Sequence, residues 1–199
     1  MAAIYSIVEG HGEVRAVPVL LRRIAQEFCG IYDLDILDPH RVPRGRMLSD
    51  NSEDLKKAIE LGKRRISSKD VPGFILVLLD ADDDCPVTLA QSIFGRIKRD
   101  DITIIVVIAN KEYESWFLKA IKSLRGTRGI SDIAEPPDDS ESIRDAKGYL
   151  ERNYFGDNEF YQETVDQARL TSIFDINEAR LSSSFDKFYR EIYGNLMAD

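Results

Sequence analysis

The chain has 199 residues, which is enough for one domain or for one domain with an appendage. Hydrophobic residues make up 43% of it, as in ordinary globular cores, and no stretch reaches the roughly 20 apolar residues of a membrane span. The net charge of −8 argues against a protein that coats nucleic acid by charge alone. Two cysteines are too few for a disulfide framework or a zinc cage, so we expect a reduced, cytoplasmic protein.

Strands and helices are predicted to alternate over residues 1–125. We expect strands at 4–8, 34–37, 74–79 and 102–109, and helices at 13–28, 52–67, 86–99 and 115–124. The third and fourth strands are apolar throughout, as in a parallel sheet that is buried on both faces. The alternation therefore predicts an α/β fold with a four-stranded, mainly parallel sheet between helices. Residues 40–50 have no periodicity and are predicted to form a basic loop.

The second part of the chain, residues 126–199, is predicted to be a small helical extension packed on the core formed by 1–125. It begins with a loop rich in glycine, proline and acidic residues. Helical segments are expected around 142–153, 162–174 and 185–193, the last of them capped by one of the serines at 182–184. No internal repeat is present.

Charged residues are unevenly distributed. Basic residues cluster between Arg41 and Lys69, and acidic residues cluster after Ser131. Solvated surface is the simpler interpretation of both clusters, and a basic rim beside an acidic pocket is the alternative.

Carboxylates follow three of the four predicted strands. Because the ends of parallel strands lie along one edge of a sheet, Glu9 would meet Asp80 and Asp82 if the first and third strands are neighbours. The negative charges of such a cluster repel one another unless a cation lies among them, and a divalent metal is the simplest candidate. The candidate metal ligands are Glu9, Glu13, Asp80, Asp82, Glu112 and Glu114.

Oxygen ligands of this kind select Mg²⁺ or Mn²⁺ rather than zinc. The carboxylates are numerous enough for one or two ions, and two ions can clamp the attacking and leaving oxygens of a phosphodiester. Lys111 lies at the same predicted edge and would offset phosphate charge. Asp84 is expected instead to cap the next helix, because Pro86 suits the first helical position.

Three segments carry a resemblance to a known family. They are Val8-Glu9-Gly10-His11-Gly12-Glu13, Leu79-Asp80-Ala81-Asp82-Asp83-Asp84, and the segment from Ala109 to Leu118 that contains Lys-Glu-Tyr-Glu. Together they resemble the TOPRIM domain of topoisomerases, bacterial primases, RecR-type repair proteins and OLD-family nucleases. The pattern is most similar to a bacterial TOPRIM-like family of unknown function related to the OLD nucleases.

The resemblance implies a TOPRIM-like Rossmannoid fold and metal-dependent phosphodiester chemistry on DNA or RNA. It implies Glu9 as a metal ligand or general acid/base, Asp80 and Asp82 as metal ligands, and Glu13 and Glu114 as ligands of a second ion. Lys111 would contact phosphate. OLD-type relatives pair this domain with an ATPase, so a separate ATPase subunit is implied, in phage defence or in repair.

Two other functions remain open from the sequence. A non-catalytic module could bind metal or nucleic acid and regulate a partner, as RecR-type TOPRIM domains do. A nucleotide-sugar transferase also places an Asp-x-Asp motif at the end of a strand, although this chain is short for one. The sequence does not distinguish DNA from RNA and does not give the oligomeric state.

Overall fold

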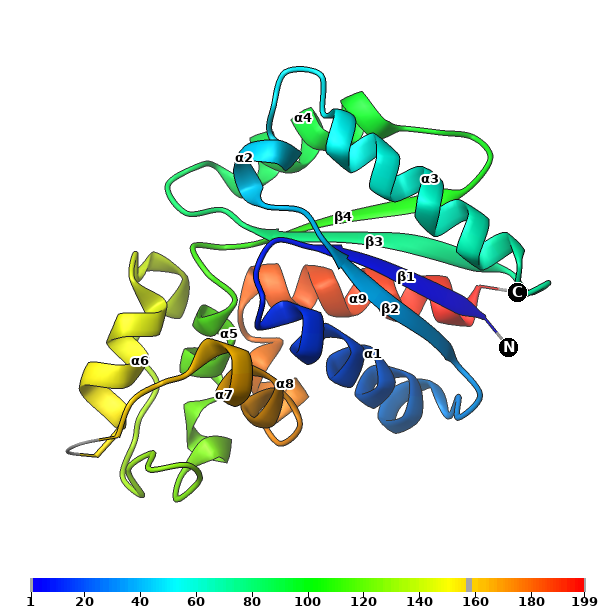
Figure 1. Cartoon of the computed structure of the whole chain (residues 1–199). Coiled ribbons are helices and arrows are strands. Elements are labelled where there is room, and N and C mark those ends of the chain that lie inside the picture. Colours follow the sequence, from blue (N-terminus) through cyan, green and yellow to red (C-terminus); the bar gives the residue numbers. More distant parts are fainter. Residues whose placement is uncertain (1, 157–158, 199) are drawn as a thin grey trace.

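A computed structural model of the chain describes residues 2–156 and 159–198 and confirms the predicted α/β fold. Four parallel strands form one sheet in the order β2-β1-β3-β4 (Figure 1). The first and third strands are therefore neighbours, which is the condition under which Glu9 was expected to lie near Asp80 and Asp82. The strands are β1 (Ala3–Val8), β2 (Asp35–Arg41), β3 (Gly73–Asp80) and β4 (Thr103–Ala109).

Helices cover both faces of the sheet. Helices α3 and α4 lie on one face, and α1 and α9 lie on the other, while α5 to α8 gather beyond the carboxyl ends of the strands (Figure 1). None of the helices in the described parts of the chain is long and apolar enough to cross a membrane. The helices are α1 (Glu13–Cys29), α2 (Arg44–Met47), α3 (Glu53–Ser67), α4 (Pro86–Ile97), α5 (Glu114–Lys119), α6 (Ala146–Tyr154), α7 (Glu163–Thr171), α8 (Ile176–Ala179) and α9 (Ser183–Met197), with 3-10 turns at Ile121–Leu124 and Ser140–Ser142.

The side chains of β3 alternate between two hydrophobic cores. Ile75 and Val77 pack with α3 and α4, whereas Leu76 and Leu78 pack with α1 and α9. Successive residues of a strand point to opposite faces, so a strand between two helical layers must be apolar at every position. This explains the uninterrupted apolar run that precedes Asp80.

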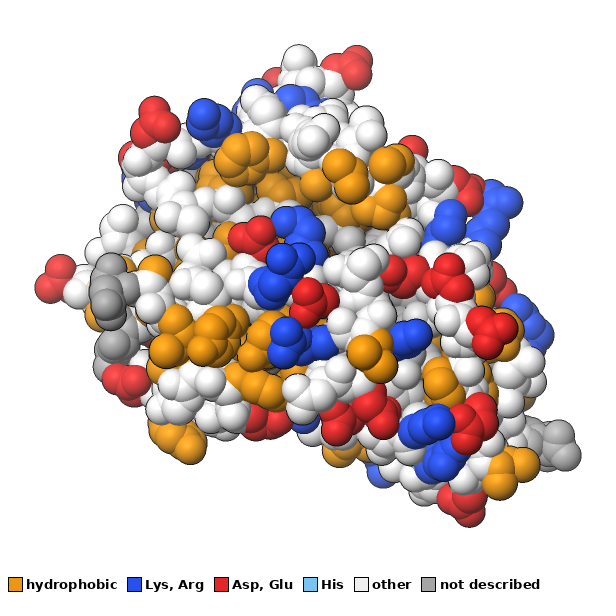
Figure 2. Space-filling model, turned by 180° about the vertical axis from the view of Figure 1, so that it is seen from behind, with side chains coloured by type: hydrophobic (Ala, Val, Ile, Leu, Met, Phe, Trp, Pro, Cys, Tyr) orange, Lys and Arg blue, Asp and Glu red, His pale blue; other side chains and the backbone are white. Residues whose placement is uncertain are grey.

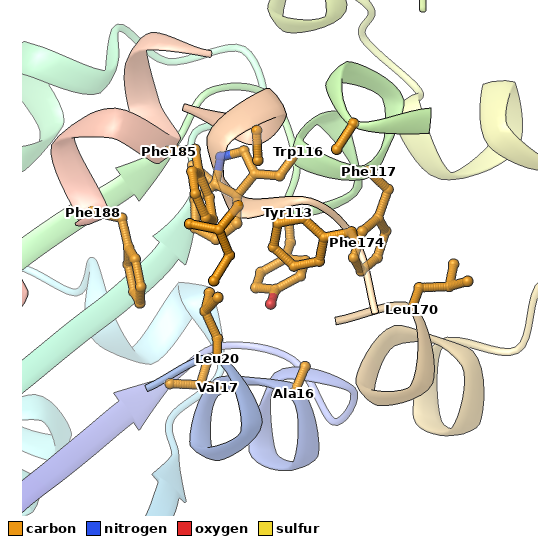
Figure 3. Close-up of a cluster of buried hydrophobic side chains, with 14 of the residues drawn as sticks. Ala16, Val17, Leu20, Tyr113, Trp116, Phe117, Leu170, Phe174, Phe185 and Phe188 are labelled. Carbon is orange, nitrogen blue, oxygen red and sulfur yellow. The ribbon is translucent and has the colours of Figure 1, made fainter. Parts of the chain in front are cut away.

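The C-terminal extension supplies part of the cover of the sheet. Helix α5 is short and leaves the sheet, and α9 packs on β4 and α1 in its place. Trp116 and Phe117 of α5 meet Phe174, Phe185 and Phe188 in one aromatic cluster (Figure 3). The indole Nε1 of Trp116 donates a hydrogen bond of 2.8 Å to Ser184 Oγ at the start of α9. The extension and the sheet therefore share one hydrophobic core.

Three local predictions differ from the structure. Residues 40–50 are not one loop, because β2 remains paired with β1 to Arg41, after a register shift, and α2 occupies Arg44–Met47. Helix α4 begins after Cys85, so Asp84 is not its cap. The four-residue helix α8 was not expected, since a single turn shows no measurable periodicity in the sequence. The predicted serine cap of the last helix is confirmed, because Ser182 Oγ accepts a hydrogen bond from the amide of Phe185.

The shared core predicts that a substitution in α9 destabilises the whole chain. Phe185→Ala removes a fully buried ring and should lower the free energy of unfolding by about 3–5 kcal/mol. Urea unfolding followed by Trp116 fluorescence and by circular dichroism measures this change. Phe160→Ala, at a ring that is 64% exposed, is the matched control. A loss below about 1 kcal/mol for Phe185→Ala would contradict a shared core.

Candidate functional site

A small cavity of about 210 Å³ lies at the carboxyl edge of the sheet. The structure brings all six predicted metal ligands to its walls, although they come from three separate segments of the sequence. Four further polar residues of the C-terminal extension complete the lining. The walls are formed by Glu9, Gly10, Glu13, Asp80, Asp82, Glu112, Glu114, Asp145, Lys147, Glu163 and Gln167.

Glu13 closes the turn between β1 and α1. Its Oε2 accepts hydrogen bonds from the backbone amides of Glu9 at 2.9 Å and Gly10 at 2.8 Å. Gly12 is required in this turn because an added Cβ would lie 2.3 Å from Gln167 Oε1 and 2.8 Å from the carbonyl oxygen of Glu163. The motif Glu-Gly-His-Gly-Glu thus allows α7 to approach the cavity closely.

Two other carboxylates are held from β3 and α5. Asp80 Oδ1 accepts a hydrogen bond of 2.9 Å from the amide of Tyr113. Glu114 Oε1 accepts hydrogen bonds from Tyr161 Oη at 2.8 Å and from Gln167 Nε2 at 3.2 Å. Neutral donors therefore fix the positions of both carboxylates.

Among the residues that the structure describes, Glu13, Asp80 and Glu114 have no cationic partner. Glu13 and Glu114 are only 3% and 4% exposed, and Asp80 is partly buried. Among residues 2–156 and 159–198, no Lys, Arg or His forms an ion pair with any of the three carboxylates. Uncompensated carboxylates are costly to bury and respond by keeping a proton or by binding a cation.

The pKa values of these carboxyl groups reflect that environment. Burial raises the pKa of Glu13 to about 8, although the amide of Gly10 lowers it, and the charges of Glu9 and Glu114 raise it further. Burial likewise raises the pKa of Glu114 to about 7. The pKa of Asp80 lies well above its usual range, first because of burial and then because of the charges of Glu13 and Glu114.

Arg44 provides positive charge on the opposite side of the cluster. Its guanidinium pairs with Asp84 at 2.6 Å and with Asp82 at 3.3 Å, and its Nη1 lies 3.9 Å from Glu9 Oε2. It also donates hydrogen bonds to the backbone carbonyls of Asp80 and Ala81. Asp84, expected as a helix cap, therefore pairs with Arg44 instead.

Residues of the extension close the cavity from the other side. Glu112 Oε2 accepts a hydrogen bond of 2.9 Å from the amide of Lys147 in the first turn of α6. Lys147 Nζ pairs with Glu163 Oε2 at 2.9 Å, and Glu163 Oε1 accepts a hydrogen bond from the amide of Gly12. Sequence reasoning missed Lys147, Glu163 and Gln167, because no local pattern links them to strand ends that lie between 35 and 151 residues away in the chain.

Lys111 lies apart from the cavity walls in the described structure. It has a positive φ of 64°, and its Nζ lies 3.9 Å from Asp83 Oδ1. Asp83 also pairs with Arg144 and faces solvent. A phosphate contact by Lys111 stays a prediction.

The donor set fits a hard divalent cation. Carboxylate and amide oxygens line the cavity, and Glu9 Oε2 and Gln167 Oε1 are buried without a hydrogen-bond partner among the described residues. As the side chains lie, the described residues contain no group of three or more His, Cys, Asp or Glu arranged to hold a metal ion.

Comparison with known proteins gives a family but no activity. A family described as a domain of unknown function (DUF4276) matches residues 8–193, and the chain belongs to that family. No curated protein matches the chain, and no solved structure matches it either. The matched segment spans all the cavity residues.

The raised pKa of Glu114 predicts a pH-dependent stability. The unfolded carboxyl loses its proton near its ordinary pKa of 4.5, whereas the folded one keeps it up to about pH 7. The folded state therefore binds more protons within this window, and stability falls as pH rises through it. Without metal, the chain should lose on the order of 2 kcal/mol from this group between pH 5 and pH 8.

Urea unfolding of the native chain and of Glu114→Gln at both pH values tests this expectation. Gln keeps the acceptor for Tyr161 but does not titrate, so the pH-dependent loss should shrink by about that amount. Glu53→Gln, at an exposed glutamate, controls for the loss of one negative charge. If the free energy of unfolding of Glu114→Gln depends on pH as strongly as that of the native chain, the raised pKa of Glu114 would be contradicted.

Proposed function

We propose that this chain is a Mg²⁺- or Mn²⁺-dependent nuclease that cleaves phosphodiester bonds in DNA or RNA. The observation that carries the proposal is the set of three carboxylates, Glu13, Asp80 and Glu114, that share a cavity and have no cationic partner in the described parts of the chain. A divalent ion would supply the missing charge, and one or two ions would neutralise phosphate and stabilise the attacking and leaving oxygens. The resemblance of the strand-end motifs to the TOPRIM domain supports the same chemistry.

The residues of the chain have distinct roles in this proposal. Asp80, Glu13 and Glu114 hold the ion or ions from the inner wall of the cavity, with Asp82 and Glu112 as further ligands. These side chains turn towards the ion when it binds, because no three of them are grouped around one point without it. Hydrogen bonds from backbone amides to Glu13 and Asp80, and from the Tyr161 hydroxyl to Glu114, limit how far these side chains turn.

Glu9 is the proposed general acid or base. Burial raises the pKa of its carboxyl above the usual value, although the guanidinium of Arg44 lowers it, and a raised pKa favours a role in proton transfer. Its Oε2 is buried without a hydrogen-bond partner among the described residues and lies 3.9 Å from Arg44 Nη1. Lys111 would contact phosphate once substrate displaces Asp83.

The proposal extends to the setting of the protein. The OLD-type resemblance suggests a separate ATPase subunit and a role in phage defence or repair, and the low cysteine content suggests the cytoplasm.

A non-catalytic regulatory module is the second candidate. Arg44 favours it, because this guanidinium already neutralises part of the acidic cluster through Glu9, Asp82 and Asp84. A protein of this kind would bind a partner without needing a divalent ion.

Nuclease activity should depend on the inner carboxylates. Plasmid DNA, single-stranded DNA and RNA incubated with Mn²⁺ should be cleaved by the native chain, and Asp80→Asn and Glu9→Gln should lower the rate by about 10²–10⁴. Glu53→Gln is the matched control, because Glu53 is an exposed glutamate on α3 that lies outside the cavity. Cleavage at the native rate in both Asp80→Asn and Glu9→Gln would exclude the proposed site.

Metal binding should release protons. At pH 7 Glu13 and Glu114 are largely or partly protonated, since their pKa values are about 8 and about 7, and metal ligation requires the charged form. Titration calorimetry with Mn²⁺ in two buffers of different ionisation enthalpy measures the protons released, which should decrease at pH 9. Absence of binding at millimolar Mn²⁺ and Mg²⁺ would favour the regulatory module instead.

A further inference from the structure

A second pocket, of about 270 Å³, lies at the end of β2 and is basic. Three cationic side chains from three different elements line it, together with one histidine and one carboxylate. They are Arg41 at the end of β2, Arg46 of α2, Lys57 of α3, His40 and Asp54. The pocket therefore gathers positive charge in a chain whose net charge is −8.

The positive charges of this pocket are only weakly neutralised. Arg46 Nε lies 3.7 Å from Asp54 Oδ2, and the Arg46 side chain is 72% exposed. Lys57 Nζ lies 3.7 Å from Glu53 Oε2, and the Lys57 side chain is 74% exposed. Ion pairs as exposed as these are screened by salt and contribute little. Within the described parts of the chain, Arg41 is exposed and forms no ion pair, so its charge is available to an anion.

The sheet joins this pocket to the acidic cavity. Arg41 is paired in register with Val8, and the residue after Val8 is Glu9, which lines the cavity. Burial raises the pKa of Glu9, and the charges of Arg44 and, to a smaller extent, Arg41 lower it. Helix α2 contributes to both sites, because Arg44 Nη1 lies 3.9 Å from Glu9 Oε2 while Arg46 lines the basic pocket. The two pockets therefore adjoin each other.

Other surfaces near the sheet do not offer such charge. The wall of the cavity that the C-terminal extension supplies carries Asp145 and Glu163, and its lysine, Lys147, is paired with Glu163 at 2.9 Å. Beside β4, at the opposite edge of the sheet, basic side chains are interspersed with acidic ones (Figure 2), and those of α9 form ion pairs of 2.9 Å. A negatively charged strand that leaves the cavity is therefore attracted most on the β2 side.

We propose that the basic pocket binds backbone phosphates of a nucleic-acid strand, next to the phosphodiester that occupies the acidic cavity. The inference rests on the proposed function, since it places the scissile phosphate in that cavity. Arg41 contacts the phosphate nearest the cavity, and Arg46 and Lys57 contact phosphates further along the strand. Contacts of this kind position a strand without reading its sequence, so the pocket accepts DNA and RNA alike.

Fluorescence anisotropy of a labelled single-stranded oligonucleotide tests the pocket on the full chain. The measurement is made at low salt in EDTA, so that no metal bridges the strand to the carboxylates. Arg41→Gln/Lys57→Gln should weaken binding about tenfold, because two phosphate contacts are lost. The slope of log K against log salt should become shallower by about 1.4. Lys187→Gln/Arg190→Gln removes two positive charges from α9 and should bind like the native chain.

Competition separates a strand from a small anion. Unlabelled oligonucleotide should displace the label at a far lower concentration of phosphate groups than inorganic phosphate does, because a strand engages several cations at once. Equal competition by inorganic phosphate would make the pocket a site for a small anion and would overturn the proposal. Native-like binding by a folded Arg41→Gln/Lys57→Gln variant, or no binding by the native chain, would overturn it too.

Cleavage in Mn²⁺ is a separate measurement and distinguishes the two proposals. A chain that binds the strand through Arg41 and Lys57 but never cleaves it would refute the proposed nuclease and uphold the pocket. A nuclease whose KM is unchanged in Arg41→Gln/Lys57→Gln would refute the pocket and uphold the proposed function.

Discussion

The burial of like charges with no cationic side chain paired to them, in the parts of the chain that the structure describes, is the constraint on which the site depends. Glu13 and Glu114 are buried, and Asp80 lies beside them at the end of β3. Mutual repulsion and loss of hydration both disfavour three charged groups there, so the cavity holds either protons or a cation. Backbone amides and the Tyr161 hydroxyl keep the carboxylates in place but supply no positive charge. This arrangement lowers the stability of the folded chain, and such destabilising clusters of buried ionisable groups are typical of functional sites.

The C-terminal extension explains how such a cavity is enclosed. The aromatic cluster around Trp116 and Phe185 fixes the extension against the sheet, and this position brings α6 and α7 over the strand ends. Lys147, Glu163 and Gln167 then form the outer wall. A sheet covered only by α1 to α4 would leave the carboxylates open to water. The family match, which runs from residue 8 to residue 193, covers both parts.

Much of this arrangement could be predicted from the sequence, for physical reasons. A strand between two helical layers is apolar at every position, so β3 and β4 were evident, and parallel topology then placed their carboxylates together. The individual partners of those carboxylates could not be predicted, although a basic rim beside an acidic pocket was one interpretation of the basic cluster. Arg44 lay in a segment expected to be a loop, and Glu163 reaches the cavity only through the packing of α7 on α1. Tertiary contacts between distant segments leave no local pattern to read.

The central claim is that the cavity at the carboxyl edge of the sheet accommodates a divalent cation. Anomalous diffraction from crystals grown in saturating Mn²⁺ tests it most directly, because the signal identifies the metal and its ligands together. The account predicts one or two manganese peaks within the cavity, ligated by Asp80 and by at least one of Glu13 and Glu114. A refined structure with no manganese in the cavity, and with Arg44 still paired to Asp82 and Asp84, would contradict it.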